Sequence, residues 1–388
     1  MLVWPLAIPM RRTVSHAASE RSVADPVVVE VELGNGVTGY GETLPRPYVT
    51  GETVPSVQAA LRGVLMQHVL GLHPASFAEA LEGADSLPFV DERDRSIPAA
   101  RAAVELALLD AYSRAFGRPL SSIAGWAGFG GFGTPGSRAA VRASGVLANR
   151  TPAGMMKTLR RLWWYGLRQF KLKVGDEGDA ERLERAYAYL RPAIAQGKAS
   201  LRLDANGAWS KDEAIDKLGD WRELPLAGVE QPLARGREED LPLLKHVIQL
   251  PLIHDESLIT LGDARRLHEA GVADGFNIRI SKCGGLLPAL RLAAFARRNG
   301  VLIQLGCMVG ETSLLSAAGL RFLEITPGVT FLEGCFGSFL LRRDVVRRPL
   351  RFGYAGGLPP LDLVGLGVPV DPARLESLCP DGPETIAL

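Results

Sequence analysis

Five short polar segments follow one another at nearly even spacing in this chain, and their rhythm limits the fold more than any other feature. Each segment closes a short apolar stretch that is typical of a strand, and steps of about 25 to 31 residues leave room for one helix between strands. In a parallel α/β barrel the strand ends meet on one face, so we expect these side chains to share a pocket. The segments are Lys171-Leu172-Lys173, Asp204-Ala205-Asn206, Glu230-Gln231-Pro232, His254-Asp255-Glu256 and Ser281-Lys282-Cys283.

The region 136–344 alternates between expected strands and amphipathic helices. Such repeats can build a closed barrel or an open doubly wound sheet. Polar groups on every successive strand favour the barrel, because an open sheet concentrates its site at one switch point. We therefore predict an α/β fold, a modified (β/α)7β TIM barrel. The expected strands are 139–147, 169–174, 200–203, 228–230, 252–255, 276–280, 301–305 and 330–333, and the helices include 179–195, 211–221 and 287–299.

Residues 1–135 are expected to form an N-terminal α+β capping domain. Two strands flank the hairpin turn Gly34-Asn35-Gly36, and helical periodicity follows at 54–69 and 97–115. The glycine cluster at 128–133 spells G-x-G-x-x-G, but it follows a helix and runs into Pro135, so we interpret it as a linker. The proline- and glycine-rich segment 345–388 is expected to pack back on the capping domain.

Composition excludes several classes of function. The 44 Lys and Arg residues nearly balance 43 Asp and Glu residues, so we expect no nucleic-acid partner. No apolar run approaches the roughly 20 residues that span a bilayer, so no membrane association is expected. Arg11 and Arg12 follow the apolar start, which is the wrong order for a signal peptide. The four cysteines lack C-x-x-C spacing, which favours a reduced, cytoplasmic setting over a zinc cluster or a disulfide framework.

Three carboxylates, Asp204, Glu230 and Asp255, come from consecutive strand ends. Hard oxygen ligands of this kind suit Mg²⁺, with Mn²⁺ as an alternative, whereas zinc prefers histidine or cysteine. Each acid taken singly could instead cap a helix, but three at matching positions favour a metal site. Asn206 points the same way as Asp204 and is expected to bind substrate or a ligand carboxylate, whereas Glu256 is expected to point away.

Lys171 and Lys173 alternate with Leu172, so both are expected to face the barrel interior. Their mutual repulsion and a nearby divalent cation should lower the pKa of one of them, which makes it usable as a base. Lys282 is expected at a strand end on the opposite side of the barrel. A base on each face of a bound carbon is the geometry for moving a proton at a stereocentre. The alternative for all three lysines is a surface position with an extended side chain.

These residues resemble the enolase superfamily, in particular its muconate-lactonising subgroup, over nearly the whole chain. The segment Gly39-Tyr40-Gly41-Glu42 resembles the family's N-terminal hairpin, and Lys171-Leu172-Lys173 resembles its Lys-x-Lys motif. The resemblance implies three metal ligands at Asp204, Glu230 and Asp255, and opposing bases at Lys173 and Lys282. The seventh strand ends in Gln304-Leu305-Gly306-Cys307-Met308 without the histidine of the mandelate racemase branch, which disfavours that branch.

The substrate is less constrained. Residues 48–53 resemble a specificity loop of dipeptide epimerases, but the eighth strand ends in Glu333-Gly334-Cys335-Phe336-Gly337, nearer the cycloisomerase pattern. Glu333 could pair with an ammonium group, act as an auxiliary acid or simply cap the strand. Residues 11–25 are expected to form either a polar loop that closes the mouth or an ordinary surface loop. Cys283, Cys307 and Cys335 are interpreted as packing residues.

The leading hypothesis is a Mg²⁺-dependent enzyme that removes and returns the α-proton of a carboxylate through an enediolate, as a racemase or epimerase of an N-acyl amino acid or dipeptide. The alternatives are a muconate-type cycloisomerase, a dehydratase similar to succinylbenzoate synthase, and a non-catalytic ligand-binding barrel. The expected partner is a small carboxylate, and a homo-oligomer is expected.

Overall fold

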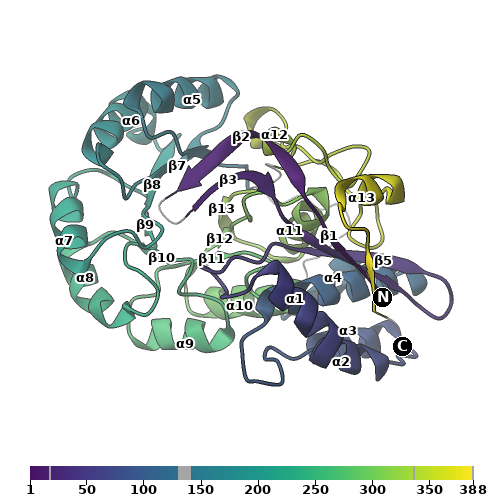
Figure 1. The fold of residues 1–388 in the computed structure, drawn as a ribbon. Coiled ribbons are helices and arrows are strands. Elements are labelled where there is room, and N and C mark those ends of the chain that lie inside the picture. Colours follow the sequence, from purple (N-terminus) through teal and green to yellow (C-terminus); the bar gives the residue numbers. More distant parts are fainter. Residues whose placement is uncertain (17–18, 130–140, 335–336, 387–388) are drawn as a thin grey trace.

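The computed structural model describes residues 1–16, 19–129, 141–334 and 337–386, and its main body is a parallel α/β barrel (Figure 1). Eight strands pair in sequence order from first to last. A parallel bridge between Ala143 and Leu332 joins the two edges, where the Ser144 amide donates to the Leu332 carbonyl at 2.8 Å. The predicted (β/α)7β barrel is thereby confirmed. The strands are β6 (Gly145–Leu147), β7 (Gln169–Lys173), β8 (Ser200–Asp204), β9 (Val229–Glu230), β10 (Leu252–His254), β11 (Gly275–Ile278), β12 (Leu302–Leu305) and β13 (Val329–Leu332).

Helices cover the outside of this barrel, and the described part has one between each pair of successive strands (Figure 1). The outward strand residues are apolar and fully buried beneath them, as at Leu172 and Leu203, because parallel strands in such a fold are covered on both faces. The helices are α5 (Pro152–Trp164), α6 (Asp179–Ile194), α7 (Lys211–Asp220), α8 (Leu241–Ile248), α9 (Leu261–Glu269), α10 (Leu286–Arg298) and α11 (Ser313–Ile325).

A second unit combines a four-stranded sheet with helices. Strands β4 (Val27–Glu32) and β5 (Thr38–Thr43) form the predicted hairpin, and α4 (Pro98–Ala115) packs on it. Gly41 is required there, because a Cβ at this position would lie 2.0 Å from the Ala103 carbonyl oxygen of α4. The helix predicted over 54–69 is interrupted: α1 (Val54–Ala60) and α2 (Met66–Leu70) flank a π-helical turn with non-helical backbone angles at Gly63.

The C-terminal segment returns to this second unit. Strand β14 (Glu384–Thr385) pairs antiparallel with β1 (Leu2–Pro5), so the two ends of the described chain share one sheet edge (Figure 1). The described helices include none long and apolar enough to cross a bilayer. The domain boundaries at residues 135 and 344 stay predictions, because the glycine-rich junction at 130–140 lies outside the described residues.

The described residues of the stretch 11–25 lie mainly in an antiparallel ribbon of β2 (Ile8–His16) and β3 (Ser19–Ala24) rather than in the loop expected from its polarity. Figure 1 shows the ribbon reaching toward β7 and β8, and Arg12 lines the same cavity as Lys171 and Lys173. Backbone pairing between the two strands satisfies the peptide groups that a polar loop would leave to water. The ribbon therefore forms one wall of the barrel mouth.

Two buried carboxylates fix the capping unit against the barrel. Glu42 on β5 accepts hydrogen bonds from the amides of Thr312 and Leu315 at the start of α11, at 2.8 and 3.0 Å. Glu105 on α4 accepts from the amides of Leu286 and Leu287 at the start of α10, at 2.8 and 2.7 Å. Each acid thus satisfies amides that a helix N-terminus leaves unpaired, across the junction of the two units.

Candidate active site

The predicted polar side chains meet at the carboxyl ends of the barrel strands. Backbone register places Lys173 beside Asp204 and Asp204 beside Glu230 on neighbouring strands. Asp204, Glu230 and Asp255 are fully buried. Because parallel strands carry their ends to one side, alternate residues of β7, β8 and β9 point into the same interior space.

Lys171 lies at the centre of the cluster and is almost fully buried. Its Nζ lies 2.8 Å from Asp204 Oδ2, 3.1 Å from Glu230 Oε2 and 2.7 Å from Glu333 Oε2. Although burial opposes it, these three carboxylates hold the pKa of Lys171 well above its usual range. The lowering expected for one of the two lysines is therefore not found at Lys171, because repulsion from a second lysine is outweighed by three close acids.

Lys173 stands nearer the opening. Its Nζ donates to Asp204 Oδ2 at 2.6 Å and to Asn206 Oδ1 at 2.5 Å, and its side chain is 24% exposed. Asn206 adopts a left-handed backbone conformation with φ of +48°, which asparagine tolerates better than most residues and which turns its amide toward Lys173. The Lys171 and Lys173 ammonium groups hold the pKa of Asp204 well below its usual value, although burial opposes this.

Glu230 is held by amides as well as by Lys171. Asn277 Nδ2 donates to Oε1 at 2.7 Å and Gln304 Nε2 donates to Oε2 at 2.9 Å. Burial, with the nearby charge of Asp204, raises the pKa of Glu230 to about 7. A cation placed against these acids would favour the ionised form of Glu230.

Two cations hold Asp255. Lys282 Nζ donates to Asp255 Oδ1 at 3.0 Å, and Arg279 Nη2 donates to Asp255 Oδ2. Although burial raises it, Arg279 and Lys282 bring the pKa of Asp255 below its usual value. Lys282 lies beyond the end of β11 rather than at a strand end, and it is fully buried. Arg279 was not among the predicted site residues, although it lies three residues before Lys282.

Glu333 and Arg202 form a buried pair inside the barrel. Arg202 Nη2 lies 2.6 Å from Glu333 Oε1, and its guanidinium lies over the Phe331 ring at 4.4 Å. With Lys171 on the other oxygen, both oxygens of Glu333 face a cation. Sequence reasoning missed Arg202, but the signal was present, because an arginine two residues before Asp204 on a strand points to the same side.

Glu256 lines the cavity rather than pointing away from it. Its Oε1 accepts from Asn206 Nδ2 at 3.2 Å, while Oε2 is buried without a hydrogen-bond partner among the described residues. Burial, with the charge of Asp255, raises the pKa of Glu256. The expected outward direction assumed a continuing strand, but β10 ends at His254 and the chain turns after it.

The carboxylates at the strand ends suit a hard divalent cation, although ammonium and guanidinium groups contact their oxygens in this structure. Within the described ranges, no three His, Cys, Asp or Glu side chains are gathered as a ready metal-binding group. Asp204, Glu230 and Asp255 supply carboxylate oxygens, and the Oε2 of Glu256, which has no partner among the described residues, is a further candidate donor. Oxygen donors of this type fit Mg²⁺ better than zinc.

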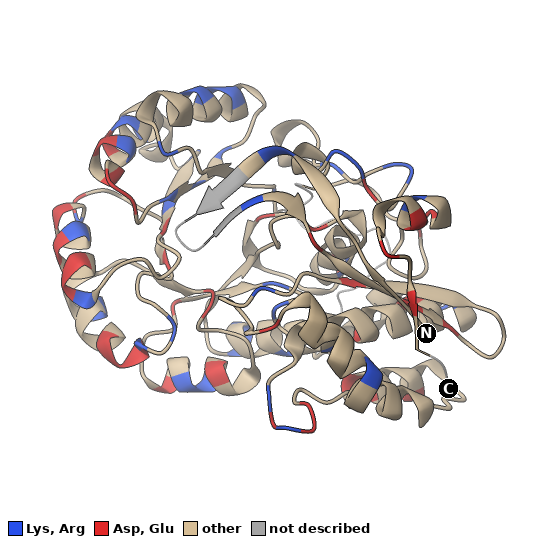
Figure 2. Ribbon diagram, in the orientation of Figure 1, with Lys and Arg blue, Asp and Glu red and all other residues tan. Residues whose placement is uncertain are grey.

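A cavity of about 580 Å³ opens above these residues. Its walls include β2, the β7 and β8 ends, α5 and the segments after β12 and β13, and Figure 2 shows basic residues on the β2–β3 ribbon. Cationic side chains outnumber acidic ones in its lining. Within the described residues, the cations are Arg12, Arg46, Arg161, Lys171, Lys173 and Arg279, and the acids are Glu256 and Glu333.

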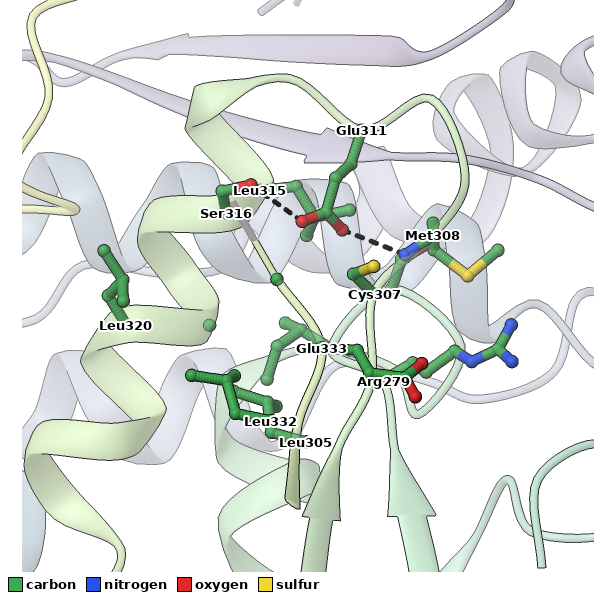
Figure 3. Close-up of a pocket in the computed structure, with 15 residues that line it drawn as sticks. Arg279, Leu305, Cys307, Met308, Glu311, Leu315, Ser316, Leu320, Leu332 and Glu333 are labelled. Atoms are coloured by element: carbon green, nitrogen blue, oxygen red, sulfur yellow. Dashed lines mark hydrogen bonds between the residues drawn. The ribbon is translucent and has the colours of Figure 1, made fainter. Parts of the chain in front are cut away.

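A second, small cavity lies between the β11 and β12 ends and α11 (Figure 3). Glu311 borders it and accepts from the Met308 amide at 3.0 Å and from the Ser316 hydroxyl at 2.7 Å. Burial raises the pKa of Glu311 to about 7. Glu311 thus links the segment after β12, at Met308, to α11, at Ser316. Cys283 is buried, Cys307 borders both cavities, and Cys335 lies outside the described residues.

Comparison with known proteins covers most of the chain. Residues 3–125 match the family model of the mandelate racemase / muconate lactonizing enzyme N-terminal domain, and residues 154–374 match the enolase C-terminal domain-like model. An L-Lys-D/L-Arg epimerase from Methylococcus capsulatus is 32% identical, with 87% of this chain and 89% of the relative covered. Muconate cycloisomerase 1 from Rhodococcus opacus is 27% identical, with 91% and 90% covered.

An N-succinyl-L-Arg/Lys racemase from Bacillus cereus is 26% identical, with 85% of each chain covered. Among solved structures, a dipeptide epimerase from Cytophaga hutchinsonii, complexed with Mg and a dipeptide, superposes with a TM-score of 0.80 at 21% identity and 97% coverage of each chain. At this sequence identity, the likeness shows the shared fold alone.

Proposed function

This chain belongs to the mandelate racemase / muconate lactonizing enzyme family of the enolase superfamily and is an isomerase, and we propose that it acts on a dicarboxylic acid whose α-proton Lys173 removes. Proton removal beside a carboxylate is the half-reaction that epimerases, racemases and cycloisomerases of this superfamily share. The substrate class and the role of each residue are the parts proposed here. The cation-rich lining of the cavity carries the proposal.

Asp204, Glu230 and Asp255 are the residues proposed to hold Mg²⁺, with Mn²⁺ as an alternative. The presence of Mg in the dipeptide epimerase structure supports this choice, as does the all-oxygen donor set. When bound, the ion would stabilise the negative charge that develops on the substrate carboxylate. Lys173 Nζ and Arg279 Nη2, which contact Asp204 and Asp255, would then be released toward the cavity.

Lys173 is the proposed base because it faces the cavity and keeps hydrogen-bond partners that orient it. In the step, the Lys173 amine takes the α-proton and the electron pair of the C–H bond moves into the carboxylate, giving an enediolate. Asn206 Oδ1 accepts from Nζ and fixes the direction of approach. Lys171 is a poor candidate for this role, because its ammonium is enclosed by Asp204, Glu230 and Glu333.

The distal end of the cavity favours an anionic group on the substrate. Arg12 on β2 and Arg161 on α5 line it away from the strand ends, whereas Arg46 is already paired with Asp25 at 2.8 Å. Guanidinium groups bind carboxylates through charge-assisted hydrogen bonds. Apolar side chains such as Leu162 and Phe339 also line the cavity. A molecule with one carboxylate at each end and an apolar middle fits this arrangement.

Away from the strand ends, the described lining of this cavity offers a free ammonium group no acidic partner, because its two acids, Glu256 and Glu333, both lie at the strand ends. Glu333, the acid considered for that role, already faces Lys171 and Arg202 with its two oxygens. An N-acyl amino acid with an acidic acyl group, or a muconate-type diacid, therefore fits better than an unblocked dipeptide. The first would exchange its α-proton through Lys173, and the second would form when Lys173 takes the α-proton of its lactone and the lactone C–O bond breaks. The homo-oligomeric state and the cytoplasmic location stay predictions.

A deuterium-exchange screen tests the substrate class. The protein with Mg²⁺ would be incubated in D₂O with N-succinyl amino acids, the matching N-acetyl amino acids, unblocked dipeptides and a muconate lactone, and the mass gain would be measured. We expect the diacids to exchange at least about tenfold faster than their N-acetyl partners, which lack the distal carboxylate and the methylene that carries it. Faster exchange of dipeptides, or no exchange by any acid, contradicts the proposal.

A further inference from the structure

Arg279 and Lys282 both reach Asp255 from the segment after β11, yet only one of them borders the substrate cavity. Arg279 lines the cavity of about 580 Å³ together with Lys173, whereas Lys282 lines neither that cavity nor the small one beside it. The side chain of Arg279 is 12% exposed and that of Lys282 is fully buried. Figure 3 shows the Arg279 side chain extending away from the small cavity near Glu311.

The ammonium group of Lys282 is fully occupied by the protein. Its Nζ donates to the Asp255 carbonyl at 2.5 Å, to the Asn277 carbonyl at 2.8 Å and to Asp255 Oδ1 at 3.0 Å. An ammonium has three N–H donors, so these three acceptors use all of them. Two of the acceptors are backbone carbonyls that no side-chain movement can withdraw. Lys282 therefore ties the β10 end to the β11 end.

Arg279 keeps unused hydrogen-bonding capacity. Its Nη2 donates to Asp255 Oδ2, whereas its Nε is buried and has no hydrogen-bond partner among the described residues. A buried N–H without a partner costs free energy unless a ligand or water supplies an acceptor. The guanidinium lies on the β11 side of the barrel, while Lys173 enters from β7. A substrate held between them would meet an amine on one side and a guanidinium on the other.

We propose that Arg279, and not Lys282, is the cation that contacts the substrate from the β11 side, which leaves Lys173 as the one amine that exchanges protons with carbon. This rests on the proposed function. A guanidinium stays protonated in proteins, so it binds an anion but accepts no proton from carbon. Arg279 would hold an oxygen of the substrate through Nε or Nη, and proton transfer would occur on the Lys173 face.

The chemistry balances with a single base. Lys173 takes the α-proton and becomes an ammonium, and the C–H electron pair forms the enediolate. The enediolate then either takes a proton back from Lys173 on the same face, or expels a β-carboxylate as its C–O bond breaks. The second outcome opens a lactone to a diacid, and its reverse closes one. The geometry therefore favours, among isomerisations, those that need one base.

Reactivity mapping of lysines tests the placement without any substrate. The native protein with Mg²⁺ would be reductively methylated with formaldehyde and a borane reductant, and peptides would be analysed by mass spectrometry. We expect Lys173 to be modified at least about tenfold faster than Lys282, whose three donors are engaged. Equal rates at the two lysines would overturn the inference, whatever the reaction proves to be.

Arg279→Lys tests the chemistry. In D₂O, the wild-type protein should incorporate deuterium at the α-carbon of the N-succinyl amino acids with retained configuration. Arg279→Lys places an amine on the opposite face, so it should raise the rate of inversion by about 100-fold, which is the contribution of a positioned proton-transfer group. Arg160→Lys, the same exchange at an exposed position of α5 outside the described cavity lining, should leave inversion unchanged. Rapid inversion by the wild-type protein that Arg279→Lys does not increase would overturn the inference. Absence of all exchange contradicts the proposed function instead, and the methylation result still decides the placement.

Discussion

Lys171 and Glu333 lie 2.7 Å apart, across the line where the first and last barrel strands meet. Lys171 comes from β7 and Glu333 follows β13, so their pairing links the two sides of the closure. Arg202 binds the other oxygen of Glu333 from β8. One carboxylate therefore contacts two buried cations, and it is part of the charge compensation that both require inside the barrel.

Glu333→Gln removes that negative charge while keeping the shape of the side chain. Since Lys171 and Arg202 would stay buried with less compensation, we expect the free energy of unfolding to fall by about 3 to 5 kcal/mol. Chemical denaturation followed by circular dichroism measures this change. Glu239→Gln, at a largely exposed ion pair, is the control and should change stability by less than about 1 kcal/mol. Equal stability of Glu333→Gln and wild type would contradict the expectation.

Lys173→Met should abolish deuterium exchange while leaving the fold intact. The amine is the proposed proton acceptor, and general-base groups contribute about 10² to 10⁴-fold to the rate. Its side chain is partly exposed, so its loss removes little packing. The exchange rate of an active diacid is the measurement, and Lys157→Met, at an exposed position on α5, is the control. Exchange within tenfold of wild type in Lys173→Met would assign the base elsewhere.

The barrel and the acids could be predicted from sequence because their signals are local. A short apolar stretch followed by a charged residue marks a strand end, and Lys173, Asp204 and Glu230 lie within or next to residues that pair on β7, β8 and β9. The burial of each charged side chain and its contacts inside the barrel were harder to predict. Lys171 and Lys173 share one face, yet only three-dimensional packing shows that Glu333, distant in sequence, reaches Lys171.

The region after β11 shows why strand ends limit such predictions. The strand was expected to run through Ile280, which would place Lys282 near its tip, but it ends at Ile278 and the chain turns. Alternation of side chains holds only along an extended chain, so the turn buries Lys282 and leaves Arg279 at the cavity. The proton-transfer role predicted for Lys282 stays a prediction, and the methylation experiment tests it.

Mg²⁺ should stabilise the folded protein. If Asp204, Glu230 and Asp255 bind the ion in the native state only, the gain is about 2.7 kcal/mol at a concentration 100 times Kd. The thermal midpoint should rise with added Mg²⁺ and fall back with a chelator. Asp255→Asn should lose most of this shift, while Asp240→Asn, which pairs with Arg237 at 2.6 Å away from the strand ends, should keep it. A thermal midpoint of the wild-type protein that does not change with added Mg²⁺ contradicts the metal assignment.

Arg161→Gln should raise KM for diacids without a matching loss of kcat. A charge-assisted hydrogen bond contributes about 1.5 to 3 kcal/mol, so KM should rise by roughly 10- to 100-fold. The matched test compares an N-succinyl amino acid with the N-acetyl form of the same amino acid, for which KM should hardly change. Equal changes of KM for both substrates would mean that Arg161 does not bind the distal carboxylate.

The two carboxylates at the junction between the capping unit and the barrel predict a pH dependence of stability. Burial raises the pKa of Glu42 to about 8 and that of Glu105 to about 7. Because the folded state holds these protons more tightly than the unfolded state, their contribution is complete below about pH 4.5 and is lost as the pH rises toward 8.

The free energy of unfolding should therefore fall by a few kcal/mol between about pH 5 and pH 8, as measured by urea denaturation. Glu42→Gln keeps an acceptor for the α11 amides but cannot ionise, so its stability should change less over this range. Glu92→Gln, at an exposed position of the same unit, should retain the wild-type slope. If Glu42→Gln and wild type show the same slope, Glu42 is ionised throughout, and the amides of Thr312 and Leu315 outweigh the cost of burying its charge.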